Sequence, residues 1–159
     1  MNKVSIQKNI KSVCLVLIAA LALSLTACKP KDPVTANDFR AHLEAQGQTV
    51  VDITDQYAGY AHVRTAFAAE FDSVHIEFFE INNRDNTNAM FKTNKEMVEA
   101  FKGNTSVNTS VSISNYQKYT LNTADNHYVV SQIETTLIYA YCAKADSDTL
   151  DTILKDLGY

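Results

Sequence analysis

Two stretches of alternating apolar and polar residues, at 61–71 and 74–78, constrain the fold of this 159-residue chain more than any other feature. Alternation with a period of two is typical of a strand that buries one face. Only Asp72-Ser73 separates the two stretches, and this spacing predicts a β-hairpin with a two-residue turn. The register of such a hairpin places Glu70 opposite His75 on the outward face.

Five further runs rich in Val, Ile, Thr and Tyr predict the remaining strands. They lie at 49–54, 107–114, 117–121, 127–132 and 135–143. Turn-forming residues separate several of these runs, notably between 122 and 126. Short connections join antiparallel neighbours, so we expect a mainly antiparallel sheet of about six to seven strands.

Three segments with apolar residues at helical spacing predict helices, at about 35–46, 85–102 and 147–157. Each has a candidate N-cap, which is Thr35 in the first, Asp85 or Asn86 in the second, and Asp146 or Ser147 in the third. The predicted order is therefore α-β-β-β-α-β-β-β-β-α. This order favours the α+β class, and we expect the three helices to pack on one face of the sheet.

The first 27 residues have the layout of an export signal. Three lysines precede an uncharged apolar run at 12–25, which is shorter than the roughly 20 residues of a membrane span. The run leads into Leu25-Thr26-Ala27-Cys28, which resembles the lipobox of bacterial lipoproteins. The resemblance implies cleavage before Cys28 and attachment of a diacylglyceryl group to its thiol. Plain secretory cleavage is the alternative, although Leu25 fits an A-x-A site poorly.

These features predict three parts: a signal peptide at 1–27, a lipidated tether at 28–33 and one α+β domain at 34–159. Two acyl chains give stable membrane residence, whereas one chain binds only marginally. We therefore expect the chain to be held by Cys28 at the extracytoplasmic face of the cell membrane. The two prolines of the tether favour extended chain, and Lys29 and Lys31 would attract anionic headgroups.

Removal of the signal would make the remaining chain markedly acidic. The signal holds three lysines and no acid, so 11 of the 14 basic residues would remain against 18 acids, and the formal charge would fall from −4 to −7. This balance argues against nucleic acid as a partner. Of the three cysteines, Cys14 would leave and Cys28 would carry lipid, so Cys142 has no disulfide partner. Its apolar surroundings favour an inert buried thiol, with a reactive thiol as the alternative.

No motif of a known catalytic or metal site is present. The four histidines include no H-x-x-H or H-E-x-x-H pair, so neither a metal nor another cofactor is expected. His75 and Glu77 share a strand face, with His62 on a neighbouring segment, and a zinc or proton-transfer site could form there. The other interpretation is an exposed polar face with a Glu70–His75 pair. Glu80 is predicted to point inward, which indicates a strand end or a bulge.

Tyrosines are frequent, and two of them, Tyr57 and Tyr60, fall in a segment predicted to be a loop. Loop tyrosines often line recognition surfaces because their rings combine apolar area with a polar hydroxyl. The candidate ligand-binding residues are therefore Tyr57, Tyr60, His62, His75 and Glu77.

Beyond the lipobox, the chain resembles small, uncharacterised lipoproteins of Gram-positive bacteria. The likeness is carried by the segments 50–57, 76–80, 103–104 and 115–120. It implies a lipid-anchored envelope domain and brings no activity. The sequence favours a non-enzymatic module that binds an envelope protein or a ligand, and an inhibitor of another envelope enzyme belongs to the same class. The alternative is an envelope hydrolase or metal-dependent enzyme that uses His62, His75 and Glu77.

Overall fold

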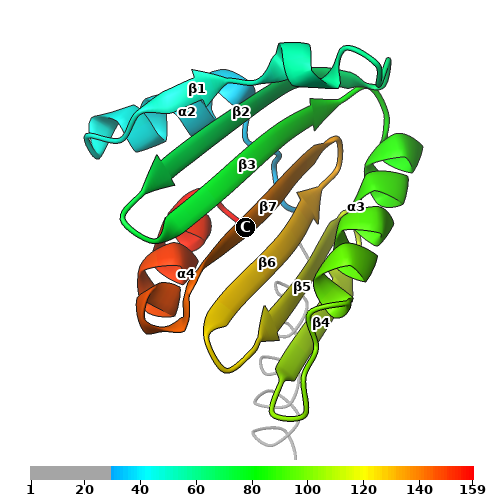
Figure 1. Cartoon of the computed structure of the whole chain (residues 1–159). Helices are drawn as coiled ribbons and strands as arrows, with labels where there is room; N and C mark the ends of the chain where they lie inside the picture. Colours follow the sequence, from blue (N-terminus) through cyan, green and yellow to red (C-terminus); the bar gives the residue numbers. More distant parts are fainter. Residues whose placement is uncertain (1–29) are drawn as a thin grey trace, which may run out of the picture. The chain divides into compact units, whose positions relative to one another are not determined.

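Seven antiparallel strands form one open sheet in the order β1-β2-β3-β7-β6-β5-β4 (Figure 1). The computed structural model describes residues 30–159, so the predicted signal peptide, Cys28 and Lys29 lie outside the described residues. The sheet belongs to the unit Lys31–Tyr159. Its strands are β1 (Val50–Asp52), β2 (Val63–Phe71), β3 (Val74–Ile81), β4 (Val107–Ile113), β5 (Tyr116–Asn122), β6 (Asn126–Ile133) and β7 (Thr136–Ala143).

Three α-helices accompany the sheet, α2 (Ala36–Ala45), α3 (Arg84–Glu99) and α4 (Ser147–Asp156). Two short 3-10 helices, η2 (Thr54–Tyr57) and η3 (Lys144–Asp146), precede β2 and α4. The α+β class, the antiparallel sheet and the order of elements are confirmed. The hairpin of β2 and β3 has the predicted register, with Glu70 opposite His75. Within residues 30–159, no helix has the length and apolarity to cross a membrane.

The helices pack on both faces of the sheet, so the prediction that all three share one face is wrong. The buried residues of α2 and α4 belong to one apolar cluster, and those of α3 belong to another. The reason lies in the central strands, which carry apolar residues on both faces. On β3, for example, Phe78 belongs to the first cluster and Phe79 to the second. We name the side under α2 and α4 the covered face and the side under α3 the open face.

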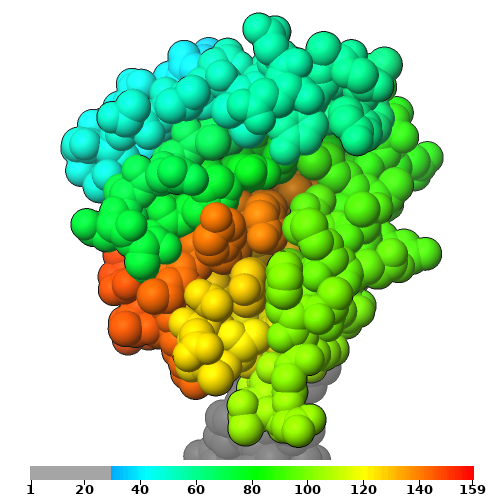
Figure 2. Space-filling model, in the orientation of Figure 1, coloured from blue at the N-terminus to red at the C-terminus, as the bar shows by residue number. Residues whose placement is uncertain are grey.

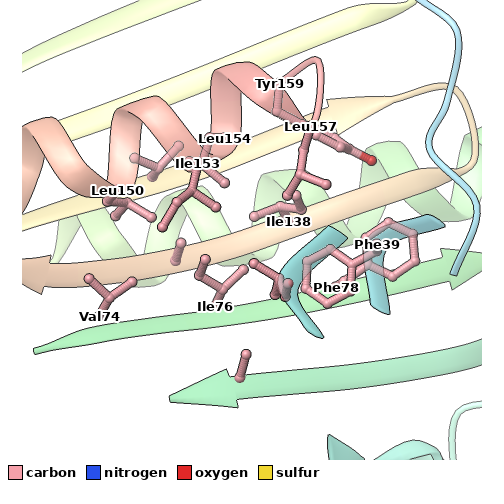
Figure 3. Packing of buried hydrophobic residues seen from close by; sticks show 14 of the residues in the cluster. Phe39, Val74, Ile76, Phe78, Ile138, Leu150, Ile153, Leu154, Leu157 and Tyr159 are labelled. Atoms are coloured by element: carbon pink, nitrogen blue, oxygen red, sulfur yellow. The ribbon is translucent and has the colours of Figure 1, made fainter. Parts of the chain in front are cut away.

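The covered face holds the larger core. Phe39 of α2 stacks on Phe78 of β3 with ring centroids 4.7 Å apart (Figure 3). Leu150 and Leu154 place the apolar stripe of α4 over the same strands and are fully buried. Burial of a large apolar side chain contributes about 1.5–3 kcal/mol, so this layer accounts for much of the stability of the domain.

Helix α2 begins where the sequence predicts. The Thr35 hydroxyl accepts a hydrogen bond from the Asp38 N–H at 3.1 Å, as expected of an N-cap. The carboxylate of Glu80 accepts a second bond, from the Ala36 N–H at 2.8 Å. Glu80 does point inward at the end of β3, as predicted, and its charge lies at the positive end of the helix.

The starts of the other two helices differ in detail from the prediction. The N-cap of α3 is Asn83, whose side-chain oxygen accepts from the Asn86 N–H at 2.9 Å, so the prediction of Asp85 or Asn86 is wrong. The helix begins earlier because β3 ends at Ile81 and Asn83, two residues further on, already caps it. Asp146 occupies the N-cap position of α4 but makes no capping bond, and the Ser73 hydroxyl binds its carboxylate instead.

Part of the predicted tether packs against one end of the sheet. The Lys31 N–H donates to Asn115 Oδ1 at 3.0 Å, and Asn115 Nδ2 donates to the Lys31 carbonyl at 2.7 Å. The Lys31 ammonium donates to the Gly158 carbonyl at 2.6 Å and lies 3.8 Å from the centroid of the Tyr116 ring. Burial and the nearby Lys118 lower the pKa of Lys31. The lysine is thus bound by the domain.

Candidate functional site

Helix α3 covers only part of the open face. Between β3 and α3, atoms of β7 and β6 reach the surface (Figure 2). The side chains that gather there are polar aromatics with charged neighbours, in contrast to the apolar layer behind the sheet. Tyr128 of β6 and Tyr139 and Tyr141 of β7 are all partly exposed.

His75 lies between two carboxylates on this face. Its Nδ1 is 2.9 Å from Glu70 Oε1, and its Nε2 is 3.1 Å from Glu77 Oε1. Both ring nitrogens can donate only when the imidazole is protonated. The hydrogen bond to Glu77 raises the pKa of His75, and the bond to Glu70 adds to this effect against the opposing effect of burial. The arrangement therefore favours an imidazolium held between two anions.

Tyrosine rings surround this ion cluster. His75 stacks on Tyr141 with ring centroids 4.8 Å apart, and Tyr139 approaches at 6.5 Å. Burial, together with Tyr141, Tyr128 and Glu77, raises the pKa of Tyr139 to about 12. Burial and the two glutamates also raise the pKa of Tyr141. These phenols stay protonated at neutral pH, so they present hydroxyl donors and aromatic faces and cannot serve as bases.

A pocket of about 320 Å³ opens beside this cluster, between η2, β3 and α3. Its volume falls at the lower end of the range for small-molecule sites, about 300–1,000 Å³. Its walls combine aromatic rings, one carboxylate, apolar side chains and the neutral polar side chains of Asn86, Thr93 and Asn94. The lining includes Tyr57, Tyr60, His62, Glu77, Phe79 and Met90.

Tyr57 connects the pocket to the ion cluster. Its ring meets Phe79 edge to face at 5.1 Å, and its hydroxyl lies 3.5 Å from Glu77 Oε2. Burial and the adjacent Glu77 raise the pKa of Tyr57 to about 12. Tyr57 therefore has a fixed ring and a protonated hydroxyl that faces the carboxylate.

Tyr60 forms the outer rim of the pocket and is 57% exposed. Its centroid is 6.1 Å from that of Tyr57 at an interplanar angle of 54°, and 5.9 Å from that of His62. The two tyrosines thus form a corner with one ring inside and one at the surface.

The structure brings the five candidate residues to one region. The pocket is lined by Tyr57, Tyr60, His62 and Glu77. His75, two residues before Glu77 on the same strand face, is bonded to Glu77. His62 and His75 do not share a set of ligands, because both nitrogens of His75 face carboxylates. Within residues 30–159, no group of three or more His, Cys, Asp or Glu side chains is arranged to hold a metal ion.

Sequence reasoning missed the far wall of the pocket. Asn86, Met90 and Thr93 come from α3, and their place depends on how that helix crosses the sheet. It also missed Tyr139 and Tyr141 as neighbours of His75. Their positions follow from pairing β3 with β7, in which His75 lies opposite Tyr141 and Glu77 opposite Tyr139.

Cys142 lies on the covered face and is fully buried. Burial raises the pKa of its thiol to about 11, and Asp146 and Asp151 add to the shift. A thiol with so high a pKa is a poor nucleophile at neutral pH. The geometry therefore agrees with a structural role and gives Cys142 no part in the site.

Comparison of the chain with known protein families, with curated proteins and with solved structures finds no match.

Proposed function

We propose that this chain is a lipid-anchored extracytoplasmic lipoprotein whose folded domain is a non-enzymatic binding module. Its ligand site is the pocket of Tyr57, Tyr60 and Glu77 on the open face. The observation that carries this proposal is the gathering of aromatic rings and one carboxylate around a hollow of small-molecule size. Two of its members, Tyr60 and Glu77, belong to neither apolar cluster, so packing of the core does not account for them.

The anchor is supported by the sequence Leu25-Thr26-Ala27-Cys28 after a signal-like segment. Replacement of Cys28 with Ala removes the thiol that would carry the diacylglyceryl group. We expect the C28A variant to lose incorporation of labelled palmitate and to accumulate as a precursor of higher mass. A C142A variant is the matched control and should be labelled as strongly as the wild type. Normal processing of C28A to a mature protein would contradict the anchor.

The binding function can be tested by a thermal-shift screen of the full-length protein in detergent. The probes are amino acids, amines, sugars and short peptides. We expect at least one class of compound to raise Tm in the wild type and in the F101A variant, but not in the Y60A variant. Phe101 is a suitable control because it is a half-exposed ring on the same face, stacked on Tyr128 outside this pocket. Equal shifts in both variants would remove the pocket from the proposal.

We favour this binding function over a hydrolytic or metal-dependent activity of His62, His75 and Glu77. A general base needs a free acceptor nitrogen, whereas the two carboxylates favour a doubly protonated His75. The phenols of Tyr57 and Tyr139 are protonated at neutral pH and add no base of their own. The arrangement supports recognition better than proton transfer.

A further inference from the structure

We infer that the pocket of Tyr57, Tyr60 and Glu77 binds an organic cation, namely the ammonium group of a small amine or of a lysine side chain. The inference rests on the proposed binding function and names the ligand class of the same site. Three properties of the pocket carry it: its aromatic corner, its single charge and its apolar floor.

The aromatic corner places two rings beside one small volume. The rings of Tyr57 and Tyr60 are 6.1 Å apart and inclined at 54°, so a group between them can contact both. Cations are attracted to aromatic faces within about 6 Å of the ring centroid, and recognition of quaternary ammonium groups uses such corners. Tyr57 is held in place by its edge-to-face contact with Phe79. The site is therefore partly formed before any ligand arrives.

The charge of the pocket is negative. Among residues 30–159, Glu77 is the only carboxylate in its lining, and no lysine or arginine lines it. Behind Glu77, His75 faces two carboxylates, Glu70 and Glu77, so the cluster is negatively charged in either protonation state of the imidazole. The contact of Glu77 Oε2 with the Tyr57 hydroxyl is long, at 3.5 Å, so this oxygen can accept a further donor.

The remaining lining selects an organic cation over a metal ion. Calcium takes six to eight oxygen ligands and magnesium requires six, usually with several carboxylates, whereas the described lining has one carboxylate and otherwise neutral oxygens from side chains such as Asn86, Thr93 and Asn94. Phe79, Met90 and Val63 instead supply apolar surface that suits methyl or methylene groups. Positive charge combined with hydrocarbon is the property of an alkylammonium group.

The test compares choline with 3,3-dimethyl-1-butanol, which has the same shape and no charge. Titration calorimetry or ligand-observed NMR is carried out with the full-length protein in detergent. We expect choline to bind at least tenfold more tightly than the neutral analogue. A second pair, Nα-acetyl-lysine amide and Nα-acetyl-norleucine amide, distinguishes a lysine side chain from a free amine. Tighter binding of the lysine compound than of choline would assign the site to a lysine side chain.

Variants locate the effect in the pocket. E77Q should weaken the binding of the preferred cation at least fivefold, and Y60L should weaken it at least threefold, because each removes one of the interactions described above. E70Q is the matched control, since it removes the same charge and also contacts His75 but does not line the pocket. It should change the affinity less than twofold.

The outcomes separate the ligand class from the binding function. Equal affinity for charged and neutral probes would overturn the cation and leave a binding site in place. An equal loss in E70Q and E77Q would overturn the assignment to this pocket. Failure of all four probes to bind would overturn the cation, while the thermal-shift screen decides the binding function independently.

Discussion

On the covered face, β3 presents Val74, Ile76 and Phe78 to the helices α2 and α4, and all three are buried. On the open face, the same strand presents His75 and Glu77, one residue further along at each step. Both sets of side chains come from the same strand, so the two faces differ only in the side chains that they present to the helices. Helix packing explains the first set of residues completely. Helix packing does not explain His75 and Glu77, so a functional role is expected on the open face.

The largest expected difference between the two faces is in access to a thiol reagent. A T93C variant places a cysteine at an exposed position of the open face. Cys142 on the covered face should react about a thousandfold more slowly than this cysteine. The reason is that Cys142 becomes accessible only on unfolding, which costs several kcal/mol. Labelling is followed by mass spectrometry of the two peptides, so that other cysteines do not interfere. Similar labelling rates would mean that the covered face opens readily.

The next difference is in the cost of truncating an aromatic ring. F78A should lower the free energy of unfolding by about 3–5 kcal/mol, since the ring is fully buried and stacked on Phe39. Y60A should lower it by less than about 1 kcal/mol, since Tyr60 is mostly exposed. Urea unfolding of both variants measures the two values. A large cost for Y60A would make the ring part of the core and weaken its assignment as a binding residue.

The smallest expected effect is a pH dependence that arises from the open face. Because the pKa of His75 is raised in the folded state, its contribution to stability is complete below the ordinary histidine pKa of about 6.5 and is lost as pH rises through the raised value. The groups that face His75 are Glu70, Glu77, Tyr139 and Tyr141. Urea unfolding across this pH range should show a decline in stability for the wild type relative to H75Q.

The source of the pH effect can be assigned with two further variants. E77Q should reduce the decline more than E70Q, because the hydrogen bond to Glu77 is the largest cause of the raised pKa. An identical pH profile in the wild type and H75Q would show that the His75 cluster contributes nothing to folding.

The fold could be predicted from the sequence wherever the signal is local. The alternation of β2 and β3 and the two-residue turn between them gave the correct register, and the Thr35 cap gave the start of α2. The prediction that α3 packs on the same face as α2 and α4 was wrong, because the face on which a helix packs is not a local property of its sequence. It depends on a second apolar set, including Phe79 and Ile81, whose neighbours on the strand also face a core.

The candidate site was also predictable only where its residues are neighbours in the sequence or in the hairpin. The spacing of His75 and Glu77 places them on one strand face, and the Glu70 partner follows from the hairpin register. The pocket itself was not predictable, because η2 and α3 lie far apart in the sequence and come together only when the sheet places them on the same face. Tyr57 and Tyr60 could be chosen as loop aromatics, but nothing local indicates that Tyr57 faces Glu77.

The pairing of Lys31 with Asn115 has a consequence for orientation. If Cys28 carries the proposed lipid, three residues of chain reach at most about 11 Å from it to Lys31. The domain would then stand close to the bilayer on the edge that holds the β4–β5 turn, and the opposite edge, which holds the β2–β3 and β5–β6 turns, would point away from it. Val63 and Asn86 of the pocket lie toward the edge nearest the bilayer, so the pocket would bind its ligand close to the membrane surface.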